Sequence, residues 1–215
     1  MKSRLLVILA SILFLAACGG ESSKPSLDLS ELSDVQLNAF VYSMTGLSTS
    51  YAIVTTDPSL ASSLSVRSVD SSCVTYSGSI DSATSGTSQI NFNCTDDLFG
   101  FSEIGYMSNV WDEGNDPKTY FMTGNIDINM SSDQGMFMYS MNINKYKLST
   151  YLDGNIELDV AMDFTFETDE YLVSMGLATA SGQPLIIDDL GQPVSGTVLV
   201  SLNGSSRTLT FPAAF

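Results

Sequence analysis

Apolar and polar residues alternate with a period of two along much of the chain after residue 50. The clearest run is 156–167, where every second residue from Ile156 to Phe166 is apolar. A strand places alternate residues on opposite faces, whereas a helix would scatter them around its circumference. The run therefore predicts a long strand with one apolar face and one acidic face. The acidic residues of that strand are Glu157, Asp159, Asp163 and Glu167.

Two pairs of alternating runs predict hairpins. One hairpin joins 126–130 to 137–143 across the loop 132–135, and the other joins 198–202 to 209–211 across 203–206. In the first hairpin a single register brings the apolar residues of both strands onto one face. The pairs expected in that register are Met130 with Phe137, Ile128 with Tyr139, and Ile126 with Met141.

Before this β-rich region, apolar residues fall at helical spacing and predict one helix near 31–45. Ser30 or Ser33 is the expected N-cap, and Gly46 is the expected stop. The competing interpretation is a strand, because apolar residues also alternate from Val35 to Val41. The fold class expected from the whole pattern is mainly β. It is an antiparallel β-sandwich or half-open β-barrel built of hairpins, with one N-terminal helix.

Composition narrows the possible functions. The chain has 24 acidic and 8 basic residues and a net charge of −16, so nucleic acid is not an expected partner. It contains no histidine, which removes the usual catalytic triads, histidine-ligated zinc and the neutral-pH proton shuttle. We therefore expect a protein that is not an enzyme.

The amino terminus has the features of a bacterial signal peptide. Residues 1–17 begin with Lys2 and Arg4, continue through a short apolar stretch and end in small residues. The next junction, Leu15-Ala16-Ala17-Cys18, resembles the lipobox of bacterial lipoproteins. That resemblance implies cleavage before Cys18 and attachment of acyl chains such as palmitate to its thiol. An ordinary secretory signal with an incidental Cys18 is the alternative.

The expected location is the bacterial cell envelope, with the protein lipid-anchored to a membrane that it does not cross. Gly19 and Gly20 follow the lipidated cysteine where an acidic residue would indicate inner-membrane retention, so the lipoprotein resemblance implies the outer membrane. Two or three acyl chains are enough for stable anchoring. The domain organisation expected is a signal peptide (1–17), a lipidated cysteine with a flexible linker (18–29) and a single β-rich domain (30–215).

Cys73 and Cys94 remain once Cys18 is lipidated, and in an oxidising compartment they predict a disulfide. Two separate buried thiols are the alternative. If Cys73 opposed Cys94 directly in a hairpin, apolar residues would lie on both faces. Either a bulge intervenes or the bridge joins strands that are not direct neighbours.

The segments 73–78 and 90–94, followed by strands that begin Gly-x-Ile, resemble uncharacterised β-rich lipoproteins of proteobacteria. This resemblance implies no particular activity.

The loop after Trp111 is rich in side chains with oxygen atoms. Asp112, Glu113, Asn115 and Asp116 lie within five residues, and hard cations such as calcium prefer oxygen ligands. These four residues form a candidate calcium site, with a solvated turn as the alternative. No other cofactor is expected.

Aromatic residues flank the same loop and could bind sugar or simply pack. They are Tyr106, Trp111, Tyr120 and Phe121.

The function expected from the sequence is that of a lipid-anchored envelope domain with a non-enzymatic binding or structural role. Its partners would be the membrane, through the anchor, and an envelope protein. The first alternative is a carrier or sensor that holds a hydrophobic ligand in a half-open barrel. The second is an enzyme that uses carboxylates alone, such as a glycosidase. The sequence does not indicate the oligomeric state.

Overall fold

The computed structural model describes residues 28–42, 45, 73–82, 84–97, 100–132, 135–188 and 192–212. The expected signal peptide, Cys18 and Gly46 lie outside the described residues, as does the linker up to residue 27.

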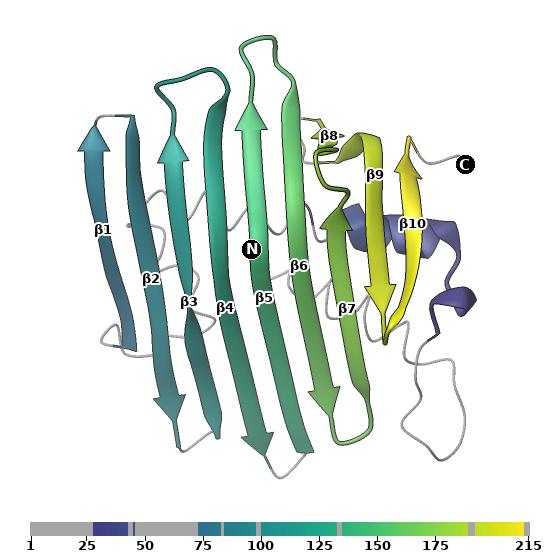
Figure 1. The fold of residues 1–215 in the computed structure, drawn as a ribbon. Coiled ribbons are helices and arrows are strands. Elements are labelled where there is room, and N and C mark those ends of the chain that lie inside the picture. Colours follow the sequence, from purple (N-terminus) through teal and green to yellow (C-terminus); the bar gives the residue numbers. More distant parts are fainter. Residues whose placement is uncertain are drawn as a thin grey trace.

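Ten strands form one antiparallel sheet, in the order β1-β2-β3-β4-β5-β6-β7-β9-β10, with the short β8 paired to β6 and β9 (Figure 1). Almost every strand therefore lies beside its neighbour in the sequence, and β1 and β10 are the two edges. The mainly β class expected from the sequence is confirmed. The strands are β1 (Val74–Ser82), β2 (Ser85–Asp96), β3 (Phe101–Asp112), β4 (Lys118–Ser132), β5 (Gly135–Thr150), β6 (Ile156–Thr168), β7 (Leu172–Thr179), β8 (Leu185–Ile187), β9 (Pro193–Leu202) and β10 (Ser205–Phe211).

One helix precedes the sheet. A 3-10 turn, η1 (Leu29–Glu31), leads into helical residues 34–42. Ser33 is the N-cap, because the backbone N–H of Gln36 donates to its Oγ while the Gln36 side chain accepts from the Ser33 N–H. The expected helix is thus confirmed, and the competing strand interpretation is wrong.

The first predicted hairpin has the register that its alternation required. Met130 pairs with Phe137, and Ile126 pairs with Met141. The second predicted hairpin also forms, but its turn is shorter than expected: Leu202 pairs directly with Ser205. Asn203 and Gly204 make this two-residue turn with φ angles of 48° and 86°. Such turns match the twist of a hairpin and favour this residue pair.

An irregularity in β5 interrupts the alternation. Ile143 pairs with Met162, whereas Lys145 pairs with Ala161, so Asn144 is an extra residue in the ladder. The pairing of β5 with β4 shifts at the same place, since Met122 pairs with Tyr146 and Gly124 pairs with Ile143. This bulge keeps Tyr146 and Ile143 on one face although they are three residues apart, and both are buried.

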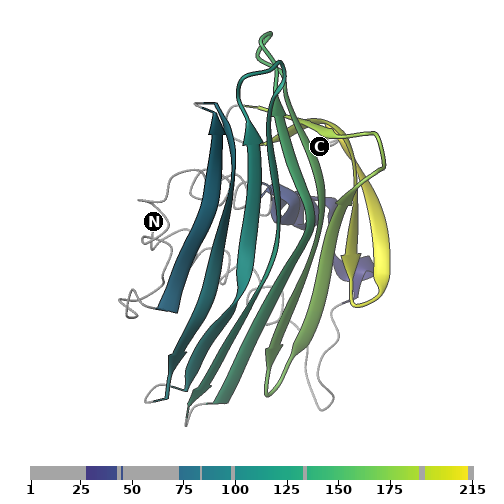
Figure 2. The same ribbon diagram turned by 60° about the vertical axis from the view of Figure 1, so that its left-hand side comes forward.

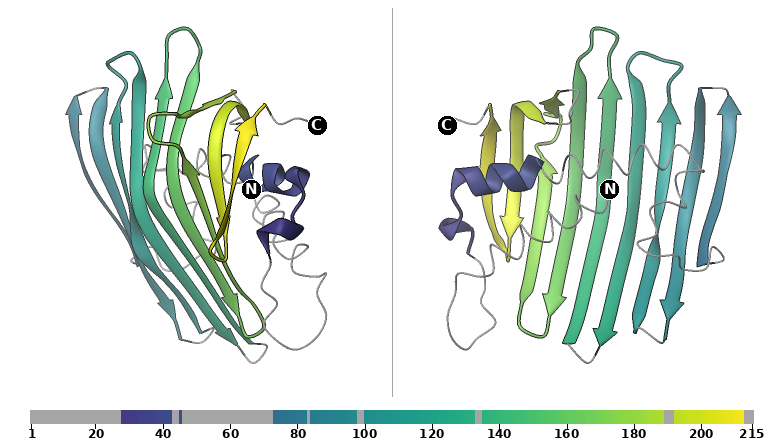
Figure 3. Two further views of the ribbon diagram at one scale, coloured as in Figure 1. Left: turned by 45° about the vertical axis from the view of Figure 1, so that its right-hand side comes forward. Right: turned by 180° about the vertical axis from the view of Figure 1, so that it is seen from behind.

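Buried apolar side chains line one face of the sheet, called here the inner face. The helix lies against this face over β7 and β9 (Figure 3), and the sheet is visibly twisted and bent (Figure 2). Leu29, the last residue of the expected linker, is itself buried, so packing of the domain already begins there. On β6 the buried residues are the ones that alternation predicted: Leu158, Val160, Met162, Phe164 and Phe166.

The disulfide between Cys73 and Cys94 is present, with the two Cα atoms 4.8 Å apart. It joins direct neighbours, because β1 pairs with β2. The conflict in the expected register disappears because Val74 pairs with Phe92, one residue away from direct opposition of the cysteines. Tyr76 then pairs with Ile90, and the apolar residues of both strands share a face.

Candidate functional site

The candidate calcium residues lie where β3 ends and in the loop that leads to β4, and they are engaged within the protein. Asp112 accepts hydrogen bonds from the Gly114 N–H at 3.0 Å and from the Asn115 side chain at 2.7 Å. Asp116 instead accepts from the Leu152 N–H at 3.1 Å, which ties this loop to the loop between β5 and β6. The geometry brings Asp112 and Asn115 together but directs Asp116 towards a neighbouring loop.

Glu113 is engaged with a residue of β4. Its carboxylate accepts a hydrogen bond from the Tyr120 hydroxyl. Burial, followed by this bond and the negative charge of Glu113, raises the pKa of Tyr120 to about 12. In the part of the chain that the structure describes, no three His, Cys, Asp or Glu residues are grouped so that they could hold a metal ion.

The four aromatic residues around the loop are divided between the two faces of the sheet. Trp111 and Tyr120 oppose each other on the inner face, and the ring of Trp111 covers Gly86. Tyr106 and Phe121 lie on the opposite face and are exposed. A site made by all four rings is therefore not formed.

The face opposite the inner face, called here the outer face, carries a continuous row of polar side chains in its middle. Asn91, Tyr106, Asn125, Asn142 and Asp163 stand directly opposite one another on the successive strands β2 to β6. We call these five residues the amide row, after the three asparagines among them. Four strand spacings of about 4.8 Å make the row roughly 19 Å long. Each of the five side chains is at least partly exposed.

Neighbouring amides orient the ends of this row. The Gln89 side chain donates to Asn91 at 2.7 Å. At the other end the bulged Asn144 accepts from Asn142 at 3.1 Å and donates to Asp163 at 3.0 Å. Amide groups have both donors and acceptors, so the row can form hydrogen bonds of either sense with a bound molecule.

The acidic residues of β6 lie on the same outer face, as alternation predicted. Lys145 on β5 contacts Asp159 at 2.7 Å, and Thr179 donates to the same carboxylate at 2.6 Å. Burial raises the pKa of Asp159, but the hydrogen bonds from Lys145 and Thr179 outweigh it, and the net pKa is lowered. This carboxylate is therefore ionised and partnered.

Two polar side chains on the inner face of β3 were not singled out from the sequence. Glu103 is 8% exposed, and burial raises the pKa of its carboxyl. Asn109 is fully buried, and among the described residues neither its Nδ2 nor its Oδ1 has a hydrogen-bond partner. Their alternation with Met107 could have indicated the inner face. However, Ile104 and Val110 alternate equally well on the outer face.

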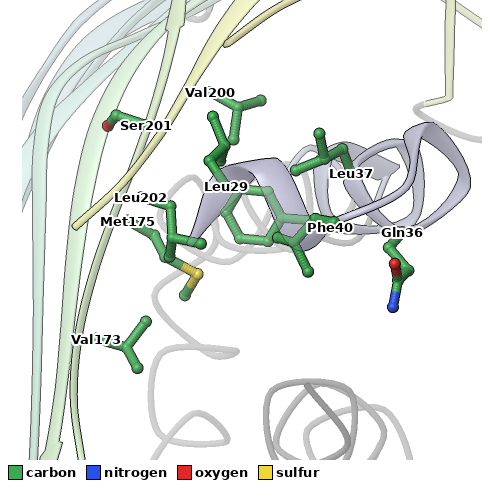
Figure 4. Close-up of a pocket in the computed structure, with 10 residues that line it drawn as sticks. Leu29, Gln36, Leu37, Phe40, Val173, Met175, Val200, Ser201 and Leu202 are labelled. Atoms are coloured by element: carbon green, nitrogen blue, oxygen red, sulfur yellow. The ribbon is translucent and has the colours of Figure 1, made fainter. Parts of the chain in front are cut away.

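A small pocket separates the helix from the sheet (Figure 4). Its cavity is about 20 Å³, which is room for one water molecule. Polar side chains contribute little to the lining of this pocket. The lining residues are Leu29, Leu32, Gln36, Leu37, Phe40, Val173, Met175, Val200, Ser201 and Leu202.

The fold and these surfaces define an open antiparallel sheet with two different faces. The helix packs on the apolar inner face over β7 and β9, and the outer face carries the row of polar side chains together with exposed apolar ones such as Ile104 and Val110. No protein-family model, no curated protein and no solved structure significantly matches the chain. Within the described residues, no helix combines the length and apolar character needed to span a bilayer.

Proposed function

We propose that this protein is a lipid-anchored, non-enzymatic binding domain of the bacterial cell envelope, held at the outer membrane through Cys18. The observation that carries the binding role is the amide row: five exposed or half-exposed polar side chains aligned on adjacent strands. A rigid sheet fixes their spacing, so binding would not require these groups to be ordered first. The partner that fits this face is an envelope protein with a polar surface.

The anchor is tested by substituting Cys18→Ala and labelling cells with a palmitate analogue. Wild-type protein should take up label and fractionate with membranes, whereas the variant should do neither. Unchanged labelling and fractionation of the variant would show that the lipobox assignment is wrong.

The binding face is tested by placing a photo-crosslinking amino acid at Tyr106 or Asn125 in living cells. Leu152, which is 86% exposed in the β5–β6 loop, is the matched control. We expect one discrete protein adduct from the two face positions, none from Leu152, and loss of the adduct when Asn142→Lys is added. Equal adducts from all three positions would contradict the proposal.

The runner-up is a carrier of a hydrophobic ligand, favoured by the apolar inner face and by the apolar pocket under the helix. A cavity of about 20 Å³ cannot hold an acyl chain, so loading would require the helix to move away from β7 and β9. The probe is cis-parinaric acid, a fluorescent fatty acid. Saturable binding at micromolar concentration, weakened by Phe40→Asp, would favour the carrier, and no binding to wild type would exclude it.

A carboxylate-only enzyme is the third candidate. Glycosidase chemistry needs a second carboxyl group several ångströms from the first across a cleft. Glu103 is the buried carboxyl with a raised pKa, and the residues paired with it on either side are Cys94 and Ile128. Neither neighbour can act as the second carboxylate, so this candidate has the least support.

A further inference from the structure

We propose that the protein forms a two-fold symmetric dimer through the free edge of β1, so that the sheets of two copies become one continuous sheet. The proposal does not depend on the binding role of the amide row.

The backbone of β1 has one side that faces away from β2. Among the described residues β1 pairs with β2 on one side only, and residues 75–79 are all exposed. The unpaired N–H and C=O groups of an edge strand are a template for another strand. The opposite edge differs, because Pro212 follows β10 and Arg207 on β10 binds the segment that leads into the helix.

The usual protections of an edge strand are missing from residues 74–79, which include no charged residue and no proline. The register irregularity of β1 lies at its far end, between Ile80 and Ser82. Across the whole hairpin 74–96 the charged residues are Asp81 and Asp96. In a chain of net charge −16, this is a region where two copies can approach with little repulsion.

The sequence of β1 is complementary to itself. An antiparallel pair centred on Ser77 places Tyr76 opposite Gly78 of the other copy, and Thr75 opposite Ser79. The residues therefore meet suitable partners, aromatic with glycine and hydroxyl with hydroxyl.

In this dimer, Gly78 of one copy would contact the ring of Tyr76 of the other, which is exposed in a single chain. Tyr76 is 43% exposed although it lies on the inner face. A Cβ atom at position 78 would lie 2.4 Å from the carbonyl oxygen of Thr87, so this position requires glycine and leaves bare backbone beside the edge. An aromatic ring from a cross-strand neighbour covers such a glycine well, and the two-fold axis would provide this contact twice.

The symmetry also limits the size of the assembly. Each copy uses its β1 edge once in an isologous contact, which closes the assembly at two copies. At the other edge, Pro212 follows β10 and Arg207 binds the segment that leads into the helix. We therefore expect no further growth into filaments.

The register is tested by cysteine crosslinking of the full protein in cells. Position 77 would lie on the two-fold axis, where the Cα atoms of an opposed antiparallel pair are about 4.5–5.5 Å apart and can form a disulfide. Ser77→Cys should give a covalent dimer on a non-reducing gel. Ser79→Cys, which is on the same face and also exposed, should give far less. Equal crosslinking at 77 and 79, or none at 77, would overturn the proposal.

A second test measures the mass of the purified lipidated protein in detergent by sedimentation. Wild type should have the mass of two chains, and Thr75→Lys with Ser79→Lys should raise the dissociation constant about tenfold, because the opposed positions then repel. Thr75→Lys with Ser79→Glu should restore the dimer. A monomeric wild type at tens of micromolar, or no difference between these two variants, would count against the dimer.

Discussion

Two buried polar residues, Asn109 and Glu103, lie on the inner face of β3. Asn109 is fully buried and pairs with Ser88 on one side and Met122 on the other, and neither polar atom of its amide is satisfied by the residues that the structure describes. Burial without a hydrogen bond is costly, so the residue weakens the fold in which it lies. Glu103, on the same face, is buried with a raised pKa. Neither could be recognised from the sequence, since β3 has apolar residues at both its odd and even positions.

We expect Asn109→Leu to stabilise the protein by about 1–3 kcal/mol, because it replaces an unsatisfied amide with an apolar group of similar size. The free energy of unfolding in urea is the measurement. Asn125→Leu, on the outer face, is the matched control and should change stability by no more than about 0.5 kcal/mol. Destabilisation by Asn109→Leu would show that its amide has a partner in solution.

Glu103 should make stability depend on pH. Burial raises the pKa of its carboxyl above the usual 4.5. Between pH 4.5 and that raised pKa, the folded protein therefore binds more protons than the unfolded chain. The contribution of Glu103 to the free energy of unfolding is therefore fully present below pH 4.5 and is lost as the pH rises through the pKa of the folded state.

Glu103→Gln cannot ionise and should lack this loss. Its stability relative to wild type should increase between about pH 4 and pH 7, as measured by urea unfolding at each pH. Glu103→Met should show the same slope with a different offset. A difference that stays constant with pH would contradict the buried position of the carboxyl.

At the scale of elements, the predictable parts of the fold are those in which alternation has one solution. The hairpin between β4 and β5 is such a case, since Met130 and Phe137 fix the register from the turn. The bulge at Asn144 was not predicted, although the apolar positions change phase there: strict alternation after Ile143 would place Lys145 on the inner face and Tyr146 on the outer face. Neither alternative expected for the disulfide, an intervening bulge or strands that are not direct neighbours, is correct. The bridge joins the neighbouring strands β1 and β2 with the cysteines one residue away from direct opposition, because a disulfide does not by itself fix the register.

The candidate site was less predictable than the fold. The acidic face of β6 follows from one strand alone. The amide row requires five strands in known register, and each of its residues is unremarkable within its own strand. In contrast, the four candidate calcium residues share closeness in sequence, which does not fix the direction of a side chain. Asp116 contacts the backbone at Leu152, and Glu113 contacts Tyr120.

The disulfide should stabilise the β1–β2 hairpin. Cys73 and Cys94 are 21 residues apart, and closing a loop of this size in the unfolded chain stabilises the fold by about 3 kcal/mol. We expect reductant to lower the free energy of unfolding of wild type by roughly this amount. Adding reductant to Cys73→Ala with Cys94→Val should change nothing, and an equal decrease in that variant would refute the explanation.

At the scale of the whole molecule, the two ends of the described chain meet at one place. Arg207 donates to the Leu32 carbonyl at 3.2 Å and pairs with Asp34, while Tyr42 packs edge-on against Phe211 with ring centroids 6.0 Å apart. The helix is thus attached to β10 near both of its ends.

Removal of the Arg207 side chain should release the start of the helix with little global effect. Both partners of this ion pair are exposed at the surface, so Arg207→Ala should cost no more than about 1 kcal/mol. Amide hydrogen exchange should accelerate in residues 34–42 and remain unchanged in β4–β6. Arg207→Lys, which keeps the charge but loses the fork of donors, should give an intermediate rate. Uniform acceleration across the sheet would contradict this local role.

The serial order of the strands also has a kinetic consequence. From β1 to β7 each strand pairs with the one before it, so hairpins can form one after another at a small loop-closure cost. The pair between Asp34 and Arg207 joins residues 173 positions apart, and it can form only when β10 is in place. Docking of the helix is therefore the last step expected in folding, and the apolar inner face beneath it stays open to chaperones until the carboxyl-terminal hairpin closes.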